Sequence, residues 1–284
     1  MFNRRYFLLS CLFLCTVVTV SSAQKNEIVF AISPMASPVS TLSGYGDFIE
    51  YLSNRTGMDI VLKQRRKYSE INSLLQEGEA QFAYTCTGAY LSGRKEFGLE
   101  VLAVPVVSGR TTYNSYIIVN RKSSYQKFAQ LRGKVFAFTD PLSLSGKIYP
   151  TYLLETMNTA ADEFFGKTFY TSSHEKSVES VAYGLSDGAA VDSLIFENME
   201  RLNDPAIANV RIIHISPPYG IPPIVVSPGA DKALKQLMLS TLLKMKDDPA
   251  GTKILEALHI EKFVLPDPAI YYSAVQMRQA ALMP

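Results

Sequence analysis

The amino-acid sequence predicts an α/β protein built as two lobes. Short apolar runs of strand length alternate with longer segments in which apolar residues recur at helical spacing, which is typical of α/β domains with largely parallel sheets. The alternation breaks near residues 110–114 and again at the prolines of residues 217–223. Two breaks indicate a chain that leaves one lobe, builds a second and returns. We therefore expect residues 24–113 and 228–284 in the first lobe and residues 114–227 in the second.

The expected elements follow from these patterns in chain order. Phe48, Ile49 and Leu52 share one face of a helix, as do Ile71 and Leu74. Runs rich in Val, Ile, Ala and Phe predict strands at 28–32, 60–62, 80–84, 101–107, 115–119, 135–138, 189–191, 210–215 and 224–226. Helical spacing predicts helices at 44–55, 69–76, 233–245, 251–258 and 270–282.

The N-terminus has the pattern of a secretory signal peptide. Arg4 and Arg5 precede an apolar run over residues 6–20, and small residues follow up to Ala23. The run is shorter than the roughly 20 residues that span a bilayer comfortably. We expect residues 1–23 to be removed and the mature protein to be periplasmic, and the paired arginines leave both general secretion and twin-arginine export open.

Charge and cysteine content exclude several classes of function. The formal net charge of +2 falls to zero without the two arginines of the signal peptide, which argues against nucleic acid or an anionic membrane as partner. Cys11 and Cys15 leave with the signal peptide, so Cys86 is the single mature cysteine and no intramolecular disulfide is expected. We expect no metal, no cofactor and a monomer.

The segment Asp140-Pro141-Leu142-Ser143-Leu144-Ser145-Gly146 carries the clearest functional signal. It joins the strand predicted at 135–138 to a helix that starts near Ser145. A helix start offers backbone N–H groups without intrahelical partners and a positive dipole end, and serine hydroxyls add donors. The segment therefore predicts an oxyanion site. The alternative is that Ser143 or Ser145 only caps the helix.

Four stretches, in order along the chain, carry a resemblance to a known family. They are KYSEI at 67–71 with GEAQFAY at 78–84, YNSYIIV at 113–119, DPLSLSG at 140–146, and SHEKSV at 173–178 with GAAVDS at 188–193. Together they resemble the PhnD-like proteins, the phosphate/phosphite/phosphonate-binding periplasmic proteins of ABC importers. The resemblance implies a type II periplasmic binding protein fold, with two α/β lobes, two crossover strands and a ligand cleft. It also implies capture of a small oxyanion for an ABC permease.

The resemblance assigns the ligand contacts. It implies that the oxyanion is held by Ser143, Ser145, the backbone of Leu144 and Gly146, and His174, with Tyr68 and Tyr113 against the ligand. A third helix start, Thr85-Cys86-Thr87, is expected to face the same cleft. Asp192 either accepts a proton from the ligand or caps a helix.

Three positions depart from the family pattern. Leu144 stands where threonine is usual, which removes a hydroxyl donor worth roughly 1.5–3 kcal/mol. Leu194 and Pro222 align with carboxylates that hold the ammonium group of aminoalkyl phosphonates in relatives. The departure at Leu144 predicts weaker binding of a tetrahedral oxyanion. The departures at Leu194 and Pro222 favour a ligand without an amine.

Cys86 keeps two alternatives open. At a helix start its thiol pKa would be lowered, and a thiolate binds thiophilic ligands such as arsenite, which would then be sensed by a periplasmic sensor domain of a signalling kinase. A buried, structural thiol is the other alternative. Cys86 and His174 could also imitate a nucleophile with its base, but the sequence offers no third orienting residue and no hydrolase motif. We therefore expect a binding protein and not an enzyme.

Overall fold

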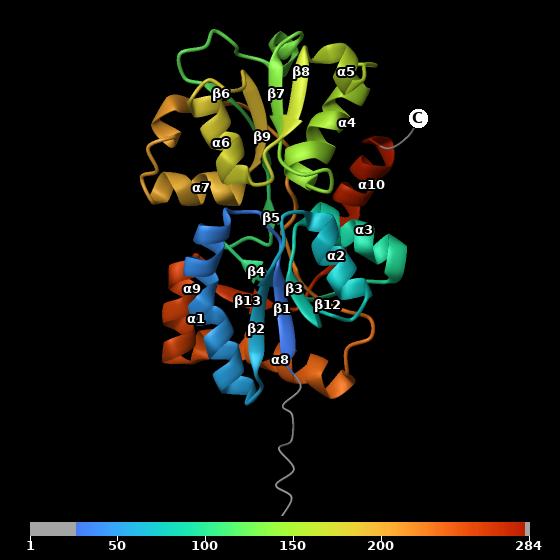
Figure 1. Cartoon of the computed structure of the whole chain (residues 1–284), viewed down its shortest axis with the longest axis vertical. Coiled ribbons are helices and arrows are strands. Elements are labelled where there is room, and N and C mark those ends of the chain that lie inside the picture. The colour runs from blue at the N-terminus through green and yellow to red at the C-terminus, as the bar shows by residue number, and fades with distance from the viewer. Residues whose placement is uncertain (1–26, 282–284) are drawn as a thin grey trace, which may run out of the picture.

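A computed structural model describes residues 27–281, with strands and helices alternating around two separate sheets (Figure 1). The predicted signal peptide, residues 1–23, lies outside the described residues. Within residues 27–281, no helix is both long enough and apolar enough to cross a bilayer.

The first lobe is built on a six-stranded sheet in the order β13-β4-β12-β3-β1-β2. Its strands are β1 (Ile28–Ile32), β2 (Ile60–Gln64), β3 (Phe82–Tyr84), β4 (Glu100–Val106), β12 (Ile224–Val226) and β13 (Lys262–Val264). Its helices are α1 (Pro38–Thr56), α2 (Tyr68–Gln76), α3 (Thr87–Phe97), α8 (Lys232–Lys244) and α9 (Pro249–Leu258), with the short helix η4 (Met245–Asp247). Apolar residues on the strands and on one face of each helix make the core of this lobe.

The second lobe is built on a five-stranded sheet in the order β10-β6-β9-β7-β8. Its strands are β6 (Ser115–Asn120), β7 (Val135–Phe138), β8 (Lys167–Tyr170), β9 (Gly188–Asp192) and β10 (Val210–Ile215). Its helices are α4 (Tyr149–Thr156), α5 (Ala161–Phe164), α6 (His174–Ala182) and α7 (Ser193–Arg201), with the short helices η1 (Phe128–Leu131), η2 (Leu144–Ile148) and η3 (Ile207–Asn209). Separate apolar clusters pack on the two faces of this sheet.

Two short strands cross between the lobes and pair with each other. In β5 (Thr112–Tyr113) and β11 (Tyr219–Gly220), Tyr113 is opposite Tyr219 and the strands run antiparallel. Figure 1 shows β5 at the narrow waist between the lobes. The C-terminal helix α10 (Tyr272–Ala281), which follows η5 (Pro268–Tyr271), contacts α4 and so also bridges the lobes.

All nine predicted strands are present, but the expectation of largely parallel sheets is wrong. Pairs β1–β2, β1–β3, β7–β8 and β7–β9 are parallel, whereas β12 and β13 in the first sheet and β6 and β10 in the second pair antiparallel with their neighbours. Strands β6 and β12 each enter their sheet from the other lobe and so run against the strands already in it. Strand β10 is antiparallel only to β6, and β13 runs in the same direction as β12. Strands β8 and β13 lacked a clear apolar signal in the sequence.

Candidate functional site

The site lies between the lobes, where the carboxyl ends of strands β1, β3, β7 and β9 meet. Ligands of open α/β sheets bind at such edges. The start of α3 touches the turn after β7 so closely that a Cβ on Gly88 would lie 2.2 Å from the Leu142 carbonyl oxygen and 2.8 Å from the Leu144 nitrogen. The lobes are therefore in contact across the cleft.

Three hydroxyls in this region are buried and have no hydrogen-bond partner. They belong to Tyr68, Tyr113 and Ser145, each with a side chain at most 2% exposed. The Tyr113 hydroxyl lies near the hydroxyls of Thr87 and Ser145 but makes no hydrogen bond of acceptable geometry with either. Tyr68 and Cys86 are also close to it. A buried hydroxyl without a partner costs about 1–3 kcal/mol, so three together indicate a place for a ligand with several acceptor atoms. We call the group formed by these three hydroxyls the cage.

Other predicted hydroxyls already have structural partners. Ser143 caps η2 by accepting the Gly146 N–H at 3.0 Å, so the alternative of a capping role describes Ser143 but not Ser145. The Thr85 hydroxyl bonds that of Ser33 at 2.8 Å, and the Thr87 hydroxyl donates to the Gly220 carbonyl at 2.7 Å.

His174 is fully buried at the start of α6. Its Nδ1 accepts the Asp192 N–H at 3.1 Å, which assigns the ring proton to Nε2, and Nε2 lies 3.4 Å from the Ser143 hydroxyl. Burial lowers the His174 pKa to about 3, so the ring is neutral at physiological pH. Thr139, which the sequence analysis missed, orients the ring through a 3.1 Å contact with Nδ1. Its position directly before the predicted loop was the available signal.

Cys86 lies at the start of α3, as expected, and of the two alternatives its burial favours the structural thiol over a thiol with a lowered pKa. Burial raises the pKa to about 11, although the N–H groups of Leu144, Gly88 and Ala89 act in the opposite direction. Desolvation of the thiolate outweighs the helix start because the side chain is fully buried. The thiol therefore stays protonated near neutral pH.

Asp192 caps α7, with its carboxylate accepting the Leu194 N–H at 2.7 Å. Burial raises its pKa to about 7. Its other possible role, accepting a proton from a ligand, stays a prediction. Among residues 27–281, no lysine or arginine side chain is buried. The cage therefore offers neutral hydrogen-bond donors to an anion, in place of a cationic side chain.

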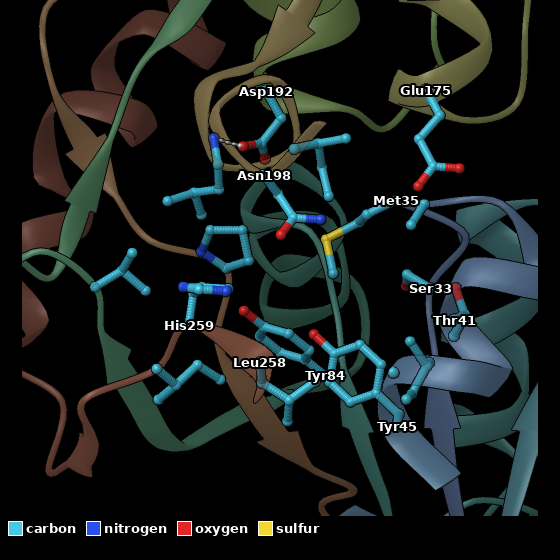
Figure 2. Close-up of a pocket in the computed structure, with 18 of the residues that line it drawn as sticks. Ser33, Met35, Thr41, Tyr45, Tyr84, Glu175, Asp192, Asn198, Leu258 and His259 are labelled. Atoms are coloured by element: carbon cyan, nitrogen blue, oxygen red, sulfur yellow. Dashed lines mark hydrogen bonds between the residues drawn. The ribbon is translucent and has the colours of Figure 1, made fainter. Parts of the chain in front are cut away.

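An open cavity of about 310 Å³ lies beside the cage, between α1, α7 and the end of α9. Figure 2 shows Met35, Asn198, Tyr45 and Tyr84 projecting into it from both lobes. Its wall also includes Leu194, Pro222, Glu175 and His259. Asp192 lines this cavity, and its backbone N–H donates to His174 Nδ1, so it connects the cavity wall to the buried histidine.

Comparison with known proteins identifies the family. Residues 30–271 match the model of the family described as ABC transporter, phosphonate, periplasmic substrate-binding protein. The chain belongs to this family. Its members are substrate-binding proteins of transporters, which confirms the expectation of a binding protein at the level of the family.

Individual relatives agree with this assignment. The probable ABC transporter phosphite-binding protein PhnD1 of Prochlorococcus marinus (strain MIT 9301) is 24% identical over 160 residues. That alignment covers 53% of each protein, so the chain matches about half the length of this relative.

Two solved structures share the fold. A binding protein component of an ABC phosphonate transporter from Pseudomonas aeruginosa superposes with a TM-score of 0.84 at 22% identity, over 90% of this chain and 86% of that one. PhnD1 from Prochlorococcus marinus in complex with methylphosphonate superposes with a TM-score of 0.81 at 16% identity, over 89% of this chain and 97% of that one. The expected type II periplasmic binding protein fold is confirmed.

Proposed function

We propose that this protein captures a small tetrahedral oxyanion of the phosphite, phosphate or phosphonate type and delivers it to an ABC importer. The observation that carries the proposal is the set of three buried hydroxyls without partners, on Tyr68, Tyr113 and Ser145. Three donors suit the three oxygens of a phosphonate or phosphite. Family membership and the methylphosphonate complex of PhnD1 support the same ligand class.

In this proposal the cage binds an anion through neutral O–H and N–H donors and not through a cationic side chain. Hydroxyl protons of Tyr68, Tyr113 and Ser145 are donated to the ligand oxygens, and the Nε2–H of His174 adds to them. The Leu144 N–H is not counted among these donors, because it already acts on the Cys86 thiol. Hydrogen bonds to a charged acceptor are stronger than neutral ones, and enclosure strengthens them further.

The ligand is proposed to lack an amine. Leu194 and Pro222 form part of the cavity wall next to the cage. Two carboxylates, of Asp192 and Glu175, also line the cavity, where they accept the N–H groups of Leu194 and Ser37. The proposal rests on Leu194 and Pro222, which are apolar where relatives carry carboxylates for the ammonium group. A thiophilic ligand is less favoured, because the Cys86 thiol is held protonated by burial.

Calorimetry with phosphite, methylphosphonate, phosphate, 2-aminoethylphosphonate and arsenite tests the proposal. We expect phosphite or methylphosphonate to bind, and 2-aminoethylphosphonate to bind more weakly than methylphosphonate. Native mass spectrometry of protein purified from the periplasm would identify a retained ligand. Binding of arsenite alone, or of none of the five compounds, would contradict the proposal.

A further inference from the structure

Two carboxylates of the second lobe each accept a backbone N–H at the start of a first-lobe helix. The Asp140 Oδ2 accepts the N–H of Tyr68, the first residue of α2, at 3.2 Å. The Glu175 Oε2 accepts the N–H of Ser37, which directly precedes α1, at 2.9 Å. Both helices are therefore capped from across the cleft.

These helix starts have a physical need for such partners. The first N–H groups of a helix have no intrahelical acceptor, and the positive dipole end favours a negative charge. In α2 the N-cap residue Lys67 supplies no side-chain cap, and Glu70 of the same helix accepts the N–H groups of Arg66 and Lys67. The Tyr68 N–H is left for Asp140.

The Asp140 contact involves a residue of the cage, and the Glu175 contact lies beside His174. Tyr68 donates its N–H to Asp140 and carries one of the unpartnered hydroxyls. Glu175 follows His174, whose own N–H donates to the Met35 carbonyl of the first lobe at 3.0 Å. Asp140 also accepts the Leu142 N–H of the oxyanion loop at 2.8 Å through Oδ1. Separation of the lobes would break both caps and dismantle the cage together.

We propose that Asp140 and Glu175 are positioning residues for ligand capture, which hold the lobes closed by capping α2 and α1 across the cleft. Neither carboxylate needs to touch the ligand. The free energy of the two caps is gained when the lobes close, so it adds to ligand affinity. This inference rests on the proposed function, because it assigns to these residues the closure that retains the oxyanion.

The test compares ligand binding with the stability of the ligand-free protein. Asp140 also accepts the Leu142 N–H of its own loop, so the comparison uses both single variants and the double variant. We expect Glu175→Ala and Asp140→Ala each to weaken methylphosphonate or phosphite binding by about tenfold, mainly through faster dissociation. The double variant should lose about a hundredfold, because separated sites add. Glu175→Gln and Asp140→Asn keep an acceptor oxygen and should lose less.

A matched control is Glu179→Ala, which removes an exposed carboxylate from the same helix α6 and should leave affinity unchanged. Small-angle scattering should show the parent contracting at lower ligand concentration than the double variant. Unchanged affinity in both alanine variants, or a lower melting temperature of the ligand-free protein without a change in affinity, would overturn the inference. A parent that binds neither compound would instead overturn the proposed function, and the inference with it.

Discussion

Two turns from strand to helix face each other across the cleft and use their hydroxyls differently. In the first lobe, β3 leads through Thr85 and Cys86 into α3, and the hydroxyls of Thr85 and Thr87 are bonded to Ser33 and to the crossover strand. In the second lobe, β7 leads through Asp140 into η2, where Ser143 caps the turn and Ser145 has no partner.

The difference shows that a hydroxyl at a helix start is available to a ligand only when no other part of the chain forms a hydrogen bond with it. The first-lobe turn is bonded to the crossover strand β11 through Gly220. The second-lobe turn supplies a free donor. The same local chemistry thus gives a scaffold on one side of the cage and a binding group on the other.

The largest effect is expected from a substitution that keeps the two turns from touching. Gly88→Ala places a Cβ against backbone atoms of the second-lobe turn, at 2.2 Å from the Leu142 carbonyl oxygen. We expect methylphosphonate binding to fall by about a hundredfold or more, because only backbone movement relieves the clash. Alanine is the better helix former, so the ligand-free melting temperature should not fall if the lobes can separate.

The control for that experiment is Gly46→Ala in α1, where a Cβ meets nothing within 4 Å. It should leave calorimetric affinity unchanged. Equal affinities in Gly88→Ala and Gly46→Ala would mean that the turns need not touch for binding.

A third turn, at the end of β9, differs from the other two because it carries an ionisable side chain, Asp192, that is fully buried. Burial raises the pKa of Asp192 from 3.8 to about 7, so between these values the folded protein holds a proton that the unfolded chain has released. Stability should therefore fall as pH rises through this window, by up to about 4 kcal/mol from this group. Asp192→Asn removes the effect while keeping an acceptor for the Leu194 N–H.

Urea unfolding at about pH 4 and about pH 8 measures this contribution. We expect Asp192→Asn to gain stability relative to the parent at the higher pH. His174, whose pKa is lowered to about 3, contributes the opposite slope in both proteins and so cancels in the difference. A difference between variant and parent that does not change with pH would show that Asp192 ionises normally.

Ser145→Ala tests the free donor of the second-lobe turn. It removes a buried hydroxyl without a partner, so ligand-free stability should stay level or rise, while oxyanion affinity falls by roughly 1.5–3 kcal/mol. Calorimetry and thermal unfolding of the same preparation measure both. A matching loss in ligand-free stability would assign Ser145 to structure.

Ser143→Ala and Thr87→Val should lower the stability of the ligand-free protein more than they lower ligand affinity, and these effects should be the smallest of the series. Loss of the cap on the Gly146 N–H, or of the bond to the Gly220 carbonyl, should lower ligand-free stability by about 1 kcal/mol. Affinity should change less than in Ser145→Ala. A larger affinity loss in Thr87→Val would place the first-lobe hydroxyl among the ligand donors.

Much of the fold was predictable because it depends on local pattern. Apolar runs located the nine expected strands, and helical spacing located α2, α8 and α9 to within a few residues. The antiparallel pairing was not predicted, since the directions of β6 and β12 depend on their entry from the other lobe. The cavity beside the cage was not predicted either, because Tyr45, Asn198 and His259 lie far apart in the sequence.

The sequence by itself determined that the chain alternates strands and helices, that hydroxyls stand at several helix starts, and that Asp140 to Gly146 is a turn suited to an oxyanion. Tertiary structure decided which hydroxyls stay free and which carboxylates reach across the cleft. Thr87 is bonded to a residue 133 positions away, and Glu175 to one 138 positions away. Burial likewise decided that the Cys86 thiol stays protonated, because desolvation depends on everything packed around it.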